Sequence, residues 1–297
     1  MIDTRQSPPQ SACRRLPPWL KKPLAHEGKT GAVATAISAG ALHTVCREAK
    51  CPNRSECFSR GTATFLVMGT TCTRSCRFCG VARGEPQLLD VDEPRRVCEA
   101  AESMGLTHAV VTSVTRDDLA DGGAAHFASI IRLFRSRLPN VTVEVLVPDF
   151  QGSAEALDIV LGAGPDVFNH NIETVPRLYP FVRPQASYRQ SLEILAKASR
   201  YGVKLRIKSG IMVGLGETAR EVLDTLHDIR VAGCNLVTIG QYLQPSEDQM
   251  PVVEFVSPDR FEWYRDQALA LGFSHAKAGP FVRSSYLAEE MVQGRRS

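Results

Sequence analysis

Short apolar runs alternate with amphipathic stretches from residue 64 onward. The runs are rich in Val and Ile and continuous, which is typical of parallel strands buried on both faces. They predict strands at Phe65–Met68, His108–Thr112, Thr142–Leu146, Asp166–Asn169, Lys204–Ser209 and Leu236–Ile239. The stretches between them predict helices at Pro94–Met104, Ala124–Leu138, Ala154–Leu161, Tyr188–Tyr201, Ala219–Ala232 and Pro258–Leu271. Several of these helices are expected to end on a C′ glycine, at Gly105, Gly202, Gly233 and Gly272.

Strands that alternate with helices indicate right-handed βαβ units and therefore an α/β fold. Six units are fewer than the eight of a closed barrel, so we expect an open, partial (β/α)6 barrel. In such folds the working residues lie at the carboxyl ends of the strands. Before the barrel, the prolines of residues 1–30 predict an extended arm, and Gly31–Leu42 predicts a short helix.

Composition narrows the function classes. The 297 residues are 43% hydrophobic, enough for a sizeable core in one or two domains. A net charge of +3, from 35 basic and 32 acidic residues, gives no support for binding to nucleic acid or an anionic membrane. No apolar run approaches the roughly 20 residues of a membrane span, and no secretory signal is recognisable. We expect a cytoplasmic protein, with the mitochondrial or plastid matrix as the alternative.

The nine cysteines are concentrated in one region, and six of them lie between Cys46 and Cys79. An odd number in a chain of this size argues against a disulfide framework and favours metal-binding thiolates in a reducing compartment. Cys13, Cys98 and Cys234 stand outside this group, and we interpret them as spare thiols.

Cys72, Cys76 and Cys79 have the spacing C-x3-C-x2-C directly after the first predicted strand, with Phe78 before the last cysteine. A [4Fe–4S] cluster held by only three thiolates leaves one iron open for another ligand. This pattern is the signature of radical S-adenosylmethionine (SAM) enzymes. Other interpretations are a buried thiol stripe on one helix face, an incomplete zinc site and a simple electron-transfer cluster. The preceding strand and the following βα units favour the radical SAM interpretation, and zinc ribbons prefer two C-x2-C pairs.

A second incomplete set, Cys46, Cys51 and Cys57, precedes the first with the spacing C-x4-C-x5-C. It suggests a second cluster, the alternative being unrelated buried thiols. With both triplets in this order, the chain resembles the lipoyl synthase family over roughly residues 42–287. The matching segments include Thr62–Met68, Val111–Ala124, Glu144–Asp149, Asn169–Thr174, Lys208–Glu217, Gly240–Pro245 and Arg283–Tyr286.

The resemblance implies three segments: an arm with an auxiliary-cluster region (residues 1–60), a radical SAM partial barrel (61–272) and a C-terminal segment (273–297) that completes the auxiliary cluster. It implies SAM and two [4Fe–4S] clusters per chain. The cluster on Cys72, Cys76 and Cys79 would reduce SAM to give a 5′-deoxyadenosyl radical. The auxiliary cluster on Cys46, Cys51 and Cys57 would supply sulfur and be consumed.

The implied reaction inserts two sulfur atoms at C6 and C8 of an octanoyl chain attached to a lysine of a carrier protein. Unactivated C–H bonds offer no acid–base handle, so a cofactor must carry this chemistry. The resemblance also implies Ser285 as the fourth ligand of the auxiliary cluster, with Ser284 as the alternative. An alkoxide is a weak partner for iron beside thiolates, which suits a ligand that must leave.

The partners implied are octanoylated lipoyl-carrier proteins, namely the glycine cleavage H protein and the E2 subunits of 2-oxoacid dehydrogenases. A ferredoxin- or flavodoxin-type electron donor and an iron–sulfur carrier for cluster repair are also expected, with no nucleic acid or membrane partner and a monomeric chain. Two rival functions remain. A tRNA methylthiotransferase would need an RNA-binding appendage, and a two-cluster electron carrier would leave the βα units unexplained.

Polar residues at the strand ends are the candidates for binding SAM. They are Thr112, Ser113, Asn169, Asn171, Glu173, Arg206, Lys208, Gly214, Gln241 and Tyr242. An acidic group could hold the ribose hydroxyls, a basic one could pair with the carboxylate, and a glycine would allow close backbone approach. We expect His170 to be a structural histidine, and Asp117, Asp118 and Asp121 to serve turns and helix caps rather than a metal.

Overall fold

The computed structural model describes residues 15–21, 30–202 and 204–293. Eight strands form one sheet in the order β1–β2–β5–β6–β7–β8–β9–β10. Their bounds are β1 His43–Thr44, β2 Thr64–Val67, β5 His108–Ser113, β6 Thr142–Leu146, β7 Val167–Asn169, β8 Arg206–Val213, β9 Leu236–Gln241 and β10 His275–Gly279. All neighbouring pairs from β2 to β10 are parallel, and β1 pairs with β2 antiparallel. A short parallel pair, β3 Thr71–Cys72 with β4 Ala82–Arg83, stands apart from this sheet.

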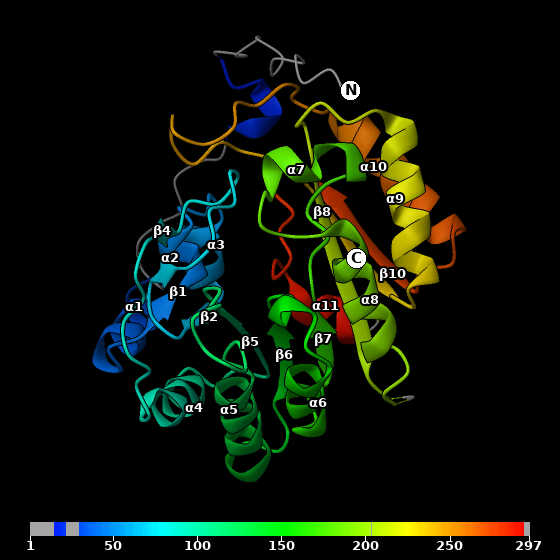
Figure 1. Ribbon diagram of the computed structural model, residues 1–297. Helices are drawn as coiled ribbons and strands as arrows, with labels where there is room; N and C mark the ends of the chain where they lie inside the picture. Colours follow the sequence, from blue (N-terminus) through cyan, green and yellow to red (C-terminus); the bar gives the residue numbers. More distant parts are fainter. Residues whose placement is uncertain (1–14, 22–29, 203, 294–297) are drawn as a thin grey trace.

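The main helices follow the strands and lie along the outside of the sheet (Figure 1). They are α4 Glu93–Ser103, α5 Ala124–Arg137, α6 Ala154–Gly162, α8 Tyr188–Ala198, α9 Ala219–Val231 and α10 Pro258–Ala270. Each packs against the next along the series, so the helix layer follows the strand order. Shorter elements are α1 Thr30–Ala39, α2 Val45–Glu48, α3 Arg54–Ser59, α7 Tyr179–Val182, α11 Ala288–Gln293 and the 3₁₀ turns η1 Pro18–Leu20, η2 Phe150–Gly152 and η3 Pro176–Leu178.

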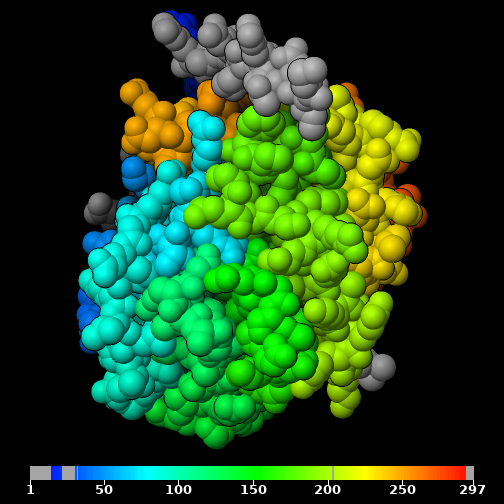
Figure 2. Space-filling model, viewed as in Figure 1, coloured from blue at the N-terminus to red at the C-terminus, as the bar shows by residue number. Residues whose placement is uncertain are grey.

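One apolar core runs between the sheet and its helices. The strands β2, β5 and β9 are almost wholly buried, as their continuous apolar runs predict. Val33, Ile37 and Leu42 of the N-terminal region belong to the same core cluster as the barrel. Figure 2 shows the corresponding surface, on which the cyan, green and yellow parts of the chain adjoin one another.

All six predicted strands and all six predicted barrel helices are present, with ends displaced by a few residues. The pattern missed the two edge strands. β1 has only two residues, and β10 is a half-buried run of Ala, Gly, His and Lys without β-branched residues. The short helix predicted at Gly31–Leu42 is α1, whereas most of the predicted arm lies outside the described residues.

The predicted C′ glycines are confirmed in three of four cases. Gly105, Gly233 and Gly272 each have positive φ, one residue beyond a helix C-cap. The prediction for Gly202 is wrong, because α8 ends at Ala198 and Gly202 does not have positive φ.

The C-terminal segment returns to the interior of the open barrel. After β10 the chain turns into α11, which contacts both β5 and β10 and lies among the strands in Figure 1. Met291 of α11 packs with Val167 and Leu236, the first residues of β7 and β9. The residues before α11 contact Gly240 of β9 through Val282, Asn169 of β7 through Ser284 and Thr64 of β2 through Ser285.

In the described part of the chain, no helix has both the length and the apolar character needed to cross a membrane.

Candidate active site

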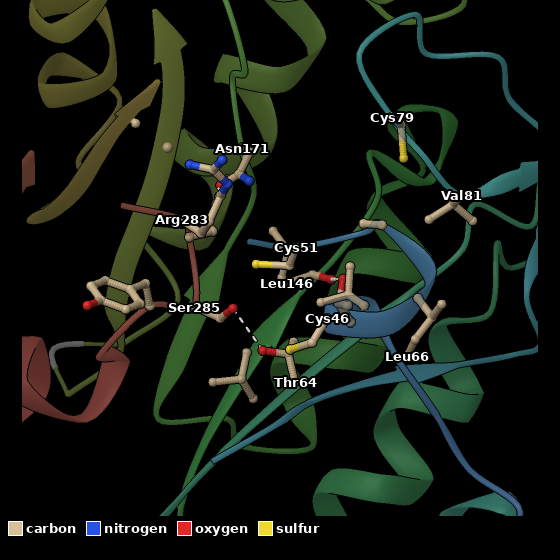
Figure 3. A pocket seen from close by; sticks show the side chains of 18 of the residues that line it. Cys46, Cys51, Thr64, Leu66, Cys79, Val81, Leu146, Asn171, Arg283 and Ser285 are labelled. Atoms are coloured by element: carbon tan, nitrogen blue, oxygen red, sulfur yellow. Dashed lines mark hydrogen bonds between the residues drawn. The ribbon is translucent and has the colours of Figure 1, made fainter. Parts of the chain in front are cut away.

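A cavity of ≈ 390 Å³ lies at the carboxyl ends of the strands, where the barrel, the N-terminal helices and the C-terminal segment meet. Its lining includes all six clustered cysteines together with Arg283, Ser284 and Ser285. Figure 3 shows Cys46 and Cys51 near Ser285, with Cys79 on a separate loop. The cysteines are free thiols. Both triplets and the C-terminal serines therefore share one cavity.

The loop that follows β2 carries Cys72, Cys76 and Cys79. Pairing of β3 with β4 fixes its two ends, and the Cys72 thiol accepts hydrogen bonds from the backbone N–H groups of Arg74 (3.4 Å) and Thr115 (3.3 Å). Burial raises the pKa of Cys76, and it raises that of Cys79 to about 12. Buried thiols of this kind become thiolates when a metal cation replaces the proton, so the donor set fits a bound cluster.

Arg74, between the first two cysteines of this loop, is buried and holds two carboxylates. Its guanidinium donates to both oxygens of Asp149 (2.6 and 2.8 Å) and to both oxygens of Asp117 (2.6 and 2.9 Å). Burial disfavours these charges, but the paired hydrogen bonds outweigh it: the pKa of Arg74 is raised and that of Asp149 lowered. The loop is thereby fastened to the carboxyl ends of β5 and β6, a restraint that the sequence analysis missed.

Of the three aspartates predicted for turns and caps, only Asp121 serves one, because the side chains of Asp117 and Asp118 pair with arginines instead. Asp121 accepts from the backbone N–H groups of Gly123 and Ala125 at the start of α5, as a cap should. Asp118 forms an ion pair with Arg116. His170 is buried between the Val147 carbonyl (2.9 Å) and the Ser191 hydroxyl (3.0 Å), and burial lowers its pKa to about 4. It is therefore a neutral structural histidine.

The first triplet lies on the two short helices α2 and α3 and the turn between them. Cys46 is buried against Thr64 of β2; burial raises the pKa of its thiol, although hydrogen bonding with Thr64 partly offsets this. The Thr64 hydroxyl also donates to Ser285 Oγ at 2.8 Å, the contact drawn in Figure 3. Thr64 thus brings Ser285 to the Cys46 thiol, although Thr64 and Ser285 are far apart in the chain.

The neighbouring hydroxyl of Ser284 is engaged elsewhere. It donates to Asn171 Oδ1 (2.6 Å) and accepts from Asn169 Nδ2 (3.2 Å). Of the two serines, Ser285 is therefore the one beside the first triplet.

Within the described residues, no three His, Cys, Asp or Glu side chains are close enough to hold a single metal ion. All six thiols of the two triplets line the same cavity. A [4Fe–4S] cluster binds each thiolate to a different iron, so two sets of three thiols fit two such clusters, each with one iron left for another ligand.

Six of the ten residues predicted to bind SAM line the cavity: Thr112, Ser113, Asn171, Glu173, Gln241 and Tyr242. The Ser113 hydroxyl is buried and, within the described residues, has no hydrogen-bond partner, so it is free to bind a ligand. Glu173 accepts from Asn171 Nδ2 (3.0 Å) and has positive φ. Burial raises the pKa of Glu173, with the nearby Arg183 charge opposing that effect.

Gln241 and Tyr242 contribute surface rather than free polar groups. The Gln241 amide donates to the carbonyls of Val213, Tyr242 and Glu254 and accepts from Val256 N. The Tyr242 hydroxyl donates to the Met250 carbonyl at 2.6 Å. Their polar atoms hold the chain after β9 in place.

The other four predicted residues, Asn169, Arg206, Lys208 and Gly214, do not line the cavity. Because β8 extends to Val213, Arg206 begins this strand and lies at its far end from the cavity. Lys208 is buried near the amino end of β8, where its ammonium pairs with Glu144 at 2.8 Å. Asn169 donates to the same carboxylate at 3.0 Å. The prediction that these residues contact SAM is therefore corrected.

Gly214 serves packing rather than ligand approach. A Cβ at this position would lie 2.1 Å from Gln241 Nε2, and its φ is +102°. Only glycine fits there.

Arg183 is a second site residue that the sequence analysis missed. It lines the cavity beside Glu173 and Cys76, donating to the Asn171 carbonyl (3.0 Å) and the Tyr179 hydroxyl (2.7 Å). Its Nε has no partner among the described residues. No sequence pattern marks it, because it follows the short helix α7 rather than a strand.

Comparison with known proteins agrees with this geometry. Residues 66–229 match the family model of the radical SAM superfamily. Lipoyl synthase of Caldanaerobacter subterraneus subsp. tengcongensis is 54% identical over 93% of this chain and 96% of its own length. The chain belongs to the lipoyl synthase family. Lipoyl synthase of Proteus mirabilis is 50% identical over 94% of this chain and 88% of its own.

Solved structures support the fold of this lipoyl synthase family member. A maturase of the [FeFe]-hydrogenase superposes with a TM-score of 0.55 at 18% identity, covering 72% of this chain and 56% of that one. Methylornithine synthase superposes with a TM-score of 0.53 at 17% identity, covering 84% and 71%. The fold is that of a radical SAM partial barrel, as the sequence predicts.

Proposed function

We propose that this chain is a radical SAM enzyme that inserts two sulfur atoms, at C6 and C8, into an octanoyl chain bound to a carrier-protein lysine. The observation that carries the proposal is the meeting of both cysteine triplets and Ser285 in one cavity. When bound, SAM and the two clusters supply the radical and the sulfur. The remaining steps, which are binding, orienting and excluding water, belong to the residues of the chain.

On the SAM side, Cys72, Cys76 and Cys79 would hold the cluster that leaves one iron open. Ser113, with its free buried hydroxyl, and the acidic Glu173 would orient the bound SAM. Arg183 adds a buried positive charge beside them. A cation in a cavity of low polarity favours a carboxylate partner.

On the auxiliary side, Cys46, Cys51 and Cys57 would hold the second cluster, with Ser285 as its fourth ligand. The support for Ser285 over Ser284 is its contact with Thr64, which adjoins Cys46. Arg283 lies close enough to Cys51 and Glu173 for electrostatic interaction with both. It would offset negative charge between the two sides of the cavity.

The wall between the two sides is apolar and fits an alkyl chain. Leu66, Val81 and Leu146 project into the cavity in Figure 3, and Val110 and Val114 extend this lining. Each methylene transferred from water into such a wall contributes about 0.8 kcal/mol. The octanoyl chain would therefore enter between the two cluster sites and exclude water from them.

The substrates of this family are octanoylated carrier proteins. For this chain we propose the glycine cleavage H protein and the E2 subunits of 2-oxoacid dehydrogenases, a ferredoxin- or flavodoxin-type electron donor, and an iron–sulfur carrier. We also propose a monomer in the cytoplasm, in keeping with the bacterial sources of its relatives, and the division into residues 1–60, 61–272 and 273–297.

The test is anaerobic turnover of an octanoyl-lysyl peptide with SAM and a reductant, followed by mass spectrometry. The expected products are a lipoyl peptide and 5′-deoxyadenosine. Cys72→Ala should abolish both products, whereas Cys51→Ala should still cleave SAM but form no lipoyl peptide. Cys98→Ala is the matched control, since this buried thiol lies on α4 outside the site.

The same assay separates the rival functions. Sulfur insertion into tRNA instead of the peptide would overturn the proposed substrate, and a wild-type protein that releases no 5′-deoxyadenosine would overturn the radical chemistry. Membership of the lipoyl synthase family argues against both outcomes.

A further inference from the structure

The C-terminal segment, residues 280–287, is seated on the barrel by contacts that the family motif does not explain. It lies against Gly210 of β8 and Gly240 of β9, and the helix α11 that follows it is packed into the barrel through Met291. Two of its amides are hydrogen-bonded locally: Val282 N donates to Gly279 O (3.1 Å) and Tyr286 N to Arg283 O (3.0 Å).

Two strand glycines leave room for the segment. A Cβ at Gly240 of β9 would lie 2.2 Å from the Val282 carbonyl oxygen. A Cβ at Gly210 of β8 would lie 2.9 Å from Asn171 Oδ1 and 3.3 Å from Ser284 Oγ. Real Cβ atoms do not approach as closely as the contact at Gly240, so a side chain there would displace the segment, whereas a side chain at Gly210 would clash with Asn171 and crowd Ser284. The barrel surface is shaped to receive it.

The two adjacent serines make different contacts. Ser284 both donates and accepts, linking Asn171 and Asn169 at the end of β7. Ser285 has a single hydrogen bond among the described residues, to the Thr64 hydroxyl. A hydroxyl held by two amides is harder to displace than one held by another hydroxyl, because each net hydrogen bond adds about 1 kcal/mol.

The Ser284 contacts continue into a rigid part of the barrel. Asn169 Nδ2 also donates to Glu144 Oε1 (3.0 Å), and Glu144 pairs with Lys208 (2.8 Å). Glu144 and Lys208 are fully buried. Ser284 is thus joined to fixed side chains rather than to a surface loop.

We propose that Ser284 is a positioning residue: it holds the C-terminal segment on Asn169 and Asn171 so that the neighbouring Ser285 faces the auxiliary cluster. This inference rests on the proposed function, in which Ser285 must bind and later leave. With Ser284 fixed, Ser285 can turn away from the cluster while its backbone stays in place. The ligand then remains at high local concentration for the next cluster.

The test compares Ser284→Ala with Ser274→Ala in the full chain, iron-loaded and iron-free. Ser274 is an exposed serine in the turn before β10 and serves as the matched control. Hydrogen exchange of the Val282 and Tyr286 amides should be up to about thirtyfold faster in Ser284→Ala, since two hydrogen bonds of about 1 kcal/mol each are lost. Ser284→Thr keeps the hydroxyl and should restore protection to within about twofold.

A second readout is iron retention under a chelator. In Ser284→Ala the auxiliary irons should be lost several-fold faster than in wild type and Ser274→Ala, and the yield of lipoyl peptide per 5′-deoxyadenosine should fall. Unchanged amide exchange in Ser284→Ala would overturn the proposal. Because exchange is measured on the protein itself, a wild type that makes no lipoyl peptide would refute the proposed function without altering this result.

Discussion

The ion pair between Glu144 and Lys208 offers the sharpest test of how the barrel interior is held. Lys208→Met removes the ammonium 2.8 Å from Glu144 Oε1 while keeping an unbranched side chain of similar length. Both groups are fully buried, so the carboxylate loses its charge partner where solvent does not screen it. Asn169 and His108 remain as its hydrogen-bond partners.

The loss of folding stability in Lys208→Met can be sized from the pKa of Glu144 and from the typical cost of breaking a buried ion pair. Burial opposes the charge of Glu144, but Lys208 and His108 outweigh burial and lower its pKa from 4.5 to about 2. At 1.36 kcal/mol per pKa unit, this shift corresponds to about 3 kcal/mol of folding stability. Breaking a buried ion pair by removing one partner typically destabilises a protein by about 3–5 kcal/mol.

The assay is thermal unfolding of the reconstituted protein under anaerobic conditions at neutral pH. A loss of this size should lower the melting temperature by on the order of 10 °C. The control is Lys204→Met, which makes the same substitution at an exposed position just before β8. It should change stability by less than about 0.5 kcal/mol. Glu144→Gln combined with Lys208→Met should recover part of the loss, because no charge is then left unpaired.

The contribution of Glu144 to stability also depends on pH. Since the pKa of Glu144 is depressed in the folded state, its stabilisation is present above about pH 4.5 and is lost as the pH falls toward 2. Lys208→Met should remove this part of the acid dependence. If Lys208→Met has the same melting temperature as Lys204→Met and the wild-type dependence of stability on acidic pH, the role assigned to this ion pair is refuted.

Three further predictions concern the cluster loop, a glycine and a histidine. Arg74→Met leaves two carboxylates without their partner and should lower bound iron from about eight toward four atoms per chain. Arg77→Met, at an exposed position of the same loop, should not lower it. Equal iron contents in the two variants would contradict the role of Arg74. Gly214→Ala should destabilise the fold by about 2–3 kcal/mol more than Gly216→Ala in urea unfolding, because both have positive φ but only Gly214 has a neighbour at 2.1 Å. Since burial lowers the pKa of His170 to about 4, stability should fall as the pH drops from about 6.5 to 4, and His170→Gln should flatten that slope in pH-dependent melts; an unchanged slope would assign it to other groups.

Much of the architecture could be predicted from the chain alone. The strand and helix pattern is local, because burial on both faces of a parallel strand requires a continuous apolar run. The cysteine spacing is also local, and it identified the two ligand triplets before their positions in space were known. The edge strand β10 escaped prediction because it is half-buried and its residues have low strand propensity.

The site itself depended on contacts between distant residues. Lys208 and Glu144 each lie in a segment that matches the family, yet their side chains form an ion pair with each other in the barrel interior. Arg74 and Arg183 carry no sequence signal, because each is defined by carbonyls and carboxylates from other loops. A one-dimensional pattern cannot say whether a charge meets a ligand or a partner.

The sequence by itself determined the fold class, the two thiolate triplets and, through resemblance, the chemistry expected of them. Only the tertiary structure placed the two C-terminal serines on different partners, Ser285 on Thr64 and Ser284 on Asn171. The physical reason is distance along the chain: Thr64 and Ser285 are 221 residues apart. Their hydrogen bond exists because β2 and the C-terminal segment meet in the folded barrel, and no local pattern records that meeting.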